Sequence, residues 1–223
     1  MKKPVKLVVY LLVCAALTFL LWARMDCPRL SAESALRRAE SANLAPKSTF
    51  LKPASLGEIL VMGSGDYKRY LVTGVTDTHL HMAQMRKKGL FWYCEDSSYR
   101  PLASVPLDGG PVTGIAPNYW PFDHFFFLYT PQLAESWVAT VTIGDLSYTT
   151  EGTCDPSGFT LFEFHQLDHC SEAVSNNLSA RAYDMIGMGY NKDSKNMDIS
   201  LTVALFATDG QPVGFASRDY PVS

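Results

Sequence analysis

The sequence predicts a mainly β chain of antiparallel sheets, preceded by a transmembrane helix and a short second helix. Residues 7–23 are apolar and carry no charge, residues 32–44 repeat alanine and leucine at helical spacing, and from residue 57 onward short apolar runs alternate with turn residues. Such runs, bounded by Gly, Pro, Asn or Asp, are typical of antiparallel strands. The 223 residues suffice for one sizeable domain or two small β units behind the helices.

The charge-free run at 7–23 is the strongest single signal. A helix of that length rises about 25 Å, and flanking basic side chains can extend it across a hydrocarbon core roughly 30 Å thick. Three lysines precede the run and one arginine follows it, which by the positive-inside rule keeps the N-terminus cytoplasmic. We therefore expect residues 1–24 to be a cytoplasmic start and a single-pass anchor in the cell membrane, with an extracytoplasmic C-terminal region. A cleaved signal peptide is the alternative.

The charge balance limits the classes of partner. The first 24 residues hold four of the 19 basic side chains and none of the 22 acidic ones, so the rest of the chain has a formal charge of −7. An acidic chain lacks the clustered Lys and Arg that bind phosphate backbones. We expect no nucleic-acid partner; the candidates are the membrane, through the N-terminal helix, and a protein or a cell-wall polysaccharide.

Residues 25–117 are expected to hold the short helix and a β meander. Ser31 can cap the helix, which runs from Ala32 to about Leu44 and is stopped by Pro46. The strands of the meander are predicted at 58–62, 67–75, 79–85 and 90–94. Proline and glycine then crowd residues 101–121, which is the predicted boundary between two β lobes.

Residues 118–223 are expected to form an immunoglobulin-like β-sandwich. Residues 125–129 read Phe-Phe-Phe-Leu-Tyr, a continuous apolar run that suits a strand buried on both faces. Further strands are predicted at 137–143, 146–150, 159–164, 181–186, 199–207 and 213–216. Short strands at this spacing, joined by turns, are typical of an antiparallel sandwich or barrel.

Cys154 and Cys170 are the candidate disulfide. Four cysteines lie outside the predicted anchor, and these two close the shortest loop among the possible pairs. On an oxidising side of the membrane such a bridge would contribute roughly 3 kcal/mol by restricting the unfolded chain. Buried free thiols are the alternative.

Residues 150–154, Thr-Glu-Gly-Thr-Cys, resemble the Thr-Leu-x-Thr-Cys motif of sortases, the cysteine transpeptidases of Gram-positive bacteria. The resemblance implies an N-terminal anchor, an extracytoplasmic β-barrel, and Cys154 as a thiol nucleophile assisted by a histidine and an arginine. Glu151 stands where the motif has leucine, and an acidic neighbour tends to raise the pKa of a thiol, the wrong direction for a nucleophile.

Two histidine pairs have spacings found at metal sites. Residues 76–81, Thr-Asp-Thr-His-Leu-His, resemble the metal-binding start of the amidohydrolase superfamily, which implies zinc ligation by His79 and His81. That family needs an eight-stranded α/β barrel, whereas short turns flank this motif. His165 and His169 share a face only of an α-helix, and no His-Glu-x-x-His general base accompanies them. We therefore predict no metal site and no cofactor.

Trp92, Trp120 and Phe122 are the aromatic side chains that could face a ligand, by stacking on sugar rings; packing inside a β core is the alternative. No catalytic residue set is complete. We expect a membrane-anchored, extracytoplasmic, non-catalytic binding or structural protein of the cell envelope, and the alternative is a sortase-like cysteine transpeptidase that uses Cys154.

Overall fold

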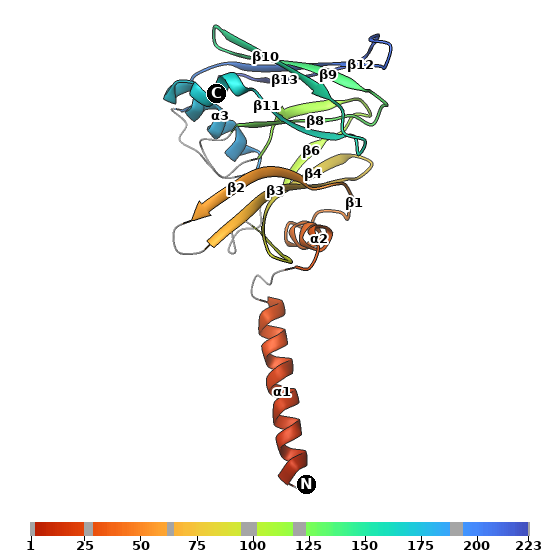
Figure 1. Cartoon of the computed structure of the whole chain (residues 1–223), viewed down its shortest axis with the longest axis vertical. Helices are drawn as coiled ribbons and strands as arrows, with labels where there is room; N and C mark the ends of the chain where they lie inside the picture. Colours follow the sequence, from red (N-terminus) through yellow and green to blue (C-terminus); the bar gives the residue numbers. More distant parts are fainter. Residues whose placement is uncertain are drawn as a thin grey trace.

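The computed structural model describes residues 3–24, 29–61, 65–94, 102–117, 124–187 and 194–222, with the side chains of 3, 4, 21–24, 59–61, 65 and 66 left out. The chain is mainly β, with 45% of its residues in strands, antiparallel sheets and three α-helices among the described residues. The predicted fold class is confirmed at this level. Figure 1 shows the sheets stacked in layers, with helix α2 (Ala32–Ala42) below them.

The first sheet contains the predicted meander. Its strands are β1 (Thr49–Phe50), β2 (Ala54–Val61), β3 (Gly65–Val75), β4 (His79–Lys88), β5 (Phe91–Cys94) and β6 (Ala103–Pro106). Strands β2 to β5 pair in chain order, β1 also pairs with β3, and β6 also pairs with β4. All these pairs are antiparallel.

Two further sheets follow. The middle sheet has the order β11-β8-β7, and the outer sheet has the order β10-β9-β12-β13. The middle sheet is built from β7 (Val112–Ile115), β8 (Phe125–Tyr129) and β11 (Phe159–Glu163). The outer sheet is built from β9 (Ser136–Ile143), β10 (Leu146–Thr153), β12 (Ile199–Phe206) and β13 (Pro212–Tyr220). The residues predicted as a lobe boundary hold β6, which joins the first sheet, and β7, which joins the middle one.

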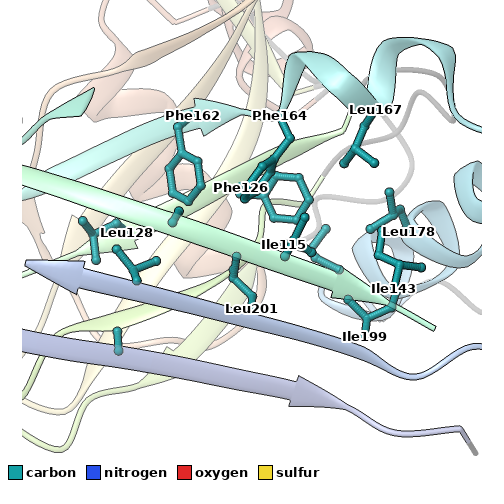
Figure 2. Close-up of a cluster of buried hydrophobic side chains, with 14 of the residues drawn as sticks. Ile115, Phe126, Leu128, Ile143, Phe162, Phe164, Leu167, Leu178, Ile199 and Leu201 are labelled. Atoms are coloured by element: carbon teal, nitrogen blue, oxygen red, sulfur yellow. The ribbon is translucent and has the colours of Figure 1, made fainter. Parts of the chain in front are cut away.

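Strand β8 is buried on both faces, as its continuous apolar run predicts. Successive side chains of a strand point to opposite faces. Phe125 and Phe127 therefore pack in one core with Leu71 and Met82 of the first sheet, which we call the inner core. Phe126 and Leu128 pack in another with the outer sheet, which we call the outer core. Figure 2 shows members of the outer core that come from different elements. They include Phe162 of β11, Leu201 of β12 and Leu178 of the helix Glu172–Asp184, together with Phe164.

Helix α2 covers the other face of the first sheet. Ser31 is its N-cap, and the Ser31 hydroxyl accepts a hydrogen bond from the Ser34 backbone N–H, so the predicted cap is confirmed. Ala35 and Leu36, and Ala39 one helical turn later, share a face of α2 and are buried against β3 and β4.

The prediction of a strand at residues 181–186 is wrong. The chain forms helix α3 (Glu172–Asp184), which Ser171 caps. Val174, Leu178 and Ala182 recur at intervals of four, the period of a helix, and they close one end of the outer core.

The predicted membrane anchor is also corrected. Helix α1 (Lys3–Arg24) extends away from the sheets in Figure 1. Over the residues that the structure describes, none of the helices combines the length and the apolar character that crossing a membrane requires. This finding contradicts the transmembrane helix and the single-pass cell-membrane localisation with an extracytoplasmic C-terminal region, and both are withdrawn.

The two-faced burial of β8 gives a direct test. Phe126→Ala and Phe127→Ala should each lower the free energy of unfolding by about 3–5 kcal/mol, because each leaves a cavity in a different core. Urea unfolding followed by tryptophan fluorescence measures this. The control is Ser217→Ala on the exposed face of β13, which should change stability by less than about 0.5 kcal/mol. A large loss for only one of the two phenylalanines would contradict the layered arrangement.

Candidate functional site

Two open concavities lie on either side of one turn, residues 153–157, which we call the 153–157 turn. The first has a volume of about 690 Å³ and lies between strand β11 and the segment that leads into β2. The second has a volume of about 810 Å³ and lies between the turn and the segment 129–135. All five residues of the turn line both concavities. We call the two together the groove.

Hydrogen bonds fix the turn between the two concavities. The Asp155 carboxylate accepts a hydrogen bond from the Ser157 backbone N–H at 2.9 Å, and the Asp155 N–H donates to the Thr160 hydroxyl at 3.0 Å. The Cys154 N–H donates to the Glu135 carbonyl at 2.8 Å. The hydrogen bond from the Ser157 N–H lowers the pKa of Asp155, and the Ser157 and Lys52 side chains lower it further. Partial burial acts in the opposite direction but does not outweigh them. Hydrogen bonds within the chain therefore hold the shape of the turn.

An ion pair forms part of the lining of the first concavity. The Lys52 ammonium lies 3.3 Å from the Asp155 carboxylate, although the two residues are 103 positions apart in the chain. Lys52 is largely exposed, so the pair contributes little to stability. It places one positive and one negative charge next to each other in the lining of the first concavity.

Cys154 lies in the groove as a free, half-buried thiol. Burial raises the pKa of Cys154 and also that of Cys170, which lowers the thiolate fraction of both at neutral pH. Both are free cysteines, so the predicted disulfide between them is not formed in this structure. His165 lines the same concavity, but its side chain is 86% exposed and its nearest charged neighbour is Asp168, at 3.8 Å. Within the described ranges, no imidazole or guanidinium hydrogen-bonds to the Cys154 sulfur.

The histidines of residues 76–81 separate into two environments. His81 is buried, whereas His79 is half-buried and its Nδ1 lies 2.9 Å from the Thr78 hydroxyl. Their ring centroids are 6.5 Å apart. In the part of the chain that the structure describes, no three His, Cys, Asp or Glu side chains are grouped so that they could hold a metal ion.

His81 belongs to a buried polar network under helix α2. The Glu40 carboxylate accepts hydrogen bonds from the Ser48 hydroxyl and from Arg37 at 2.9 Å, and it lies 3.0 Å from His81 Nδ1. Gly74 lies directly beneath Ser48, because a Cβ there would collide with the Ser48 hydroxyl. Glu40, Ser48 and His81 are at most 4% exposed.

The order of groups in this network is not that of a nucleophilic triad. In a triad the imidazole lies between the serine and the carboxylate and takes the serine proton. Here the carboxylate of Glu40 lies between Ser48 and His81, so the imidazole has no hydrogen bond to the serine hydroxyl. We therefore assign the network to the docking of α2 on the first sheet.

The second histidine pair lies on a short 3₁₀ helix, η1 (His165–His169). This helix has three residues per turn, so positions four apart do not share a face as they do in an α-helix. Both histidines are exposed and point to no shared partner among the described residues.

Of the three aromatic candidates, Trp92 is the one that the structure describes. Trp92 is 8% exposed and packs between α2 and the first sheet, with its ring centroid 4.9 Å from that of Tyr70. Trp120 and Phe122 lie outside the described residues. Trp92 is a core residue, because Ala32, Ala35 and Leu36 of the helix cover it.

Sequence reasoning missed the residues that shape the groove. Residues 155–158, Asp-Pro-Ser-Gly, have the composition of a tight turn and could have been found from it. The contact of Lys52 with Asp155 could not, because no local pattern indicates a pairing over that distance in the chain.

The Glu40 network predicts a pH-dependent stability. Burial by itself raises the pKa of Glu40, but hydrogen bonds from Ser48, His81 and Arg37 together outweigh it and lower the pKa below 4.5. A depressed carboxyl pKa stabilises the fold above 4.5, and this stabilisation is lost as pH falls through the native value. Glu40→Gln should cost about 3 kcal/mol at pH 7 by urea unfolding. The difference from wild type should begin to shrink as pH falls below 4.5 and should be lost as pH falls through the lower native pKa, because the native carboxyl then becomes protonated as well.

Glu33→Gln is the matched control, because Glu33 pairs with the same Arg37 at 3.1 Å but is half exposed. It should cost about 0.5 kcal/mol or less. Equal effects of the two variants, or a Glu40→Gln effect that persists undiminished in acid, would contradict the assigned role of the network.

The thiols should differ in reactivity. Burial raises the pKa of Cys94 to about 11, so iodoacetamide at pH 7 should label it last, after Cys154 and Cys170 and well after the exposed Cys14. Peptide mass spectrometry over a time course gives the order. Labelling of Cys154 before Cys14 would show an activated thiol and would support a transpeptidase.

Comparison with known proteins assigns no family to this geometry. No protein-family model matches the chain, and neither the curated proteins nor the solved structures contain a significant match. The groove, the Glu40 network and the layered sheets are therefore the basis on which a function is proposed.

Proposed function

We propose that this chain is a non-catalytic binding protein that holds an extended ligand in the groove. The observation that carries the proposal is a pair of concavities, about 690 and 810 Å³, that share a turn fixed by hydrogen bonds. Binding sites for ligands are typically clefts of roughly 300–1,000 Å³ that are largely formed before the ligand arrives. A wall that is already rigid costs little entropy on binding.

The chemistry of the groove favours binding over covalent catalysis. A cysteine transpeptidase needs a thiolate at neutral pH, and burial shifts the pKa of Cys154 away from that state. The Glu40 network is sealed from solvent under α2 and is ordered wrongly for proton transfer from Ser48. A structural role and a polysaccharide ligand remain predictions alongside a protein ligand.

The immunoglobulin-like sandwich also belongs to this proposal. The middle and outer sheets hold three and four antiparallel strands around the outer core, which is the general arrangement of such a sandwich. The first sheet adds a third layer to it. The groove then lies where the sandwich meets the first sheet.

A blocking variant tests the proposal. The probes are a displayed library of random short peptides and two oligosaccharides, chitohexaose and cellohexaose, each bound to the full chain. Thr153 is exposed and lines both concavities, so Thr153→Trp should weaken binding of the best probe at least about tenfold.

Ser147→Trp is the matched control on the same strand, because Ser147 is also exposed but lies outside both concavities. It should change the affinity less than about twofold. Failure of every probe to bind, or equal loss in both variants, would refute the groove as a binding site.

A further inference from the structure

We propose that the groove takes an extended, basic polypeptide segment, which adds to the free edge of strand β11 as a new antiparallel or parallel strand. This inference rests on the proposed function, because it names the ligand class of the same groove. Addition of a peptide strand to an open sheet edge is an established way in which proteins recognise extended peptides. Main-chain hydrogen bonds supply affinity in that mode, and side-chain contacts supply specificity.

Strand β11 is the edge of the middle sheet, and its free side faces the groove. The order of the sheet is β11-β8-β7, so among the described residues β11 pairs with β8 on one side and with no strand on the other. All five residues of β11, Phe159–Glu163, line the first concavity. The edge of this strand that faces away from β8 therefore borders a space that is already open.

The hydrogen-bond phase of the sheet shows which groups are unpaired. The Thr130 N–H donates to the Gly158 carbonyl at 2.9 Å, which marks Gly158 and Thr130 as a hydrogen-bonded pair of the β8–β11 ladder. Such pairs alternate along an antiparallel ladder. The backbone N–H and C=O groups of Thr160 and Phe162 therefore hydrogen-bond to β8. The N–H and C=O of Leu161, which lies between them, point away from β8.

The other side of β8 has the complementary phase. The Ala116 N–H donates to the Phe125 carbonyl at 2.8 Å, so Phe125 and Phe127 bond toward β7. The backbone N–H and C=O groups of Phe126 and Leu128 therefore point toward β11. This is the same alternation that the Thr130–Gly158 hydrogen bond indicates. The Phe159 N–H, which also points to the free side, lies 3.4 Å from the Ser157 hydroxyl. Leu161 is then the central residue whose backbone can pair with an incoming strand.

Three other sheet edges, those of β2, β13 and β10, carry features that hinder strand addition. Strand β2 has a bulge between Ser55 and Glu58, and β13 begins with Pro212 and has a bulge opposite Leu205 and Phe206 of β12. On β10 the Thr149 carbonyl already accepts a hydrogen bond from the Gln166 side chain. The register of β11 with β8 is continuous, and the strand has neither proline nor lysine.

The charges of the groove favour a basic segment. Three carboxylates line it, those of Glu135, Asp155 and Glu163, against one ammonium, that of Lys52, which is already paired with Asp155. An extended segment with Lys or Arg at alternate positions places its cations on one face of the added strand. That face can then meet the carboxylates, and binding should weaken as salt is added.

The experiment uses the full chain and peptides selected from the random displayed library. Leu161→Pro removes the outward N–H while the ladder to β8 is kept, since proline is tolerated on an edge when its missing N–H faces solvent. It should weaken peptide binding at least about tenfold, whereas Leu161→Ala, which keeps the N–H, should weaken it less than about threefold. The selected peptides should be enriched in Lys and Arg.

A second arm leaves the protein unchanged. The best peptide is resynthesised with N-methyl groups at alternate positions, in the two possible phases. One phase should lose at least about tenfold in affinity and the other less than about threefold, because only one set of peptide N–H groups points to β11. Equal affinities of both phases and of the parent peptide would overturn strand addition, even if Leu161→Pro fails to fold.

The outcomes separate this inference from the proposed function. Binding of chitohexaose or cellohexaose that Thr153→Trp abolishes, with no peptide enriched, would overturn the ligand class and leave the binding function standing. Selection of acidic peptides would overturn the charge preference. Binding of peptides that Thr153→Trp does not affect would refute the groove itself.

Discussion

Burial of strand β8 on both of its faces is the constraint on which the rest of the structure depends. A strand with phenylalanine on both faces must have an apolar layer on each side of it, because each exposed ring would leave a large apolar area in water. Phe127 is covered by the first sheet and Phe126 by the outer sheet, so the three sheets must stack with the middle one between. The two cores, which pack on opposite faces of β8, follow from this one strand.

The central place of β8 also determines where ligands can reach the chain. In the part of the chain that the structure describes, the middle sheet has two strands besides β8, so β11 becomes an edge next to β8, at the junction of the layers. The turn that precedes β11 is fixed by Asp155 and forms the common wall of the groove. On the far side of the first sheet, buried polar contacts between Glu40 and His81 hold α2 in place. These two residues are 41 positions apart in the sequence. Binding and stabilising polar groups thus lie on different layers.

Local patterns predicted the elements better than they predicted the contacts between them. The apolar run at 125–129 and the Ser31 cap both gave the observed elements, because side-chain burial and capping are local properties. Helix α3 is not predicted, although Val174, Leu178 and Ala182 recur at the period of a helix. The end of the helix, within residues 181–186, instead fits the regular series of predicted strands. The groove depends on Lys52 meeting Asp155 and on β11 lacking a second neighbour, and both are properties of the packed sheets.

Amide hydrogen exchange of the full chain tests the central place of β8 most directly. All amides of a strand paired on both sides and buried on both faces should exchange only when the whole domain unfolds. Phe126, Phe127 and Leu128 should be the most protected, with a common free energy of opening, and the outward amides of β10 should exchange through much smaller openings. Amides of Phe126 to Leu128 that exchange as readily as those of β10 would contradict the layered fold.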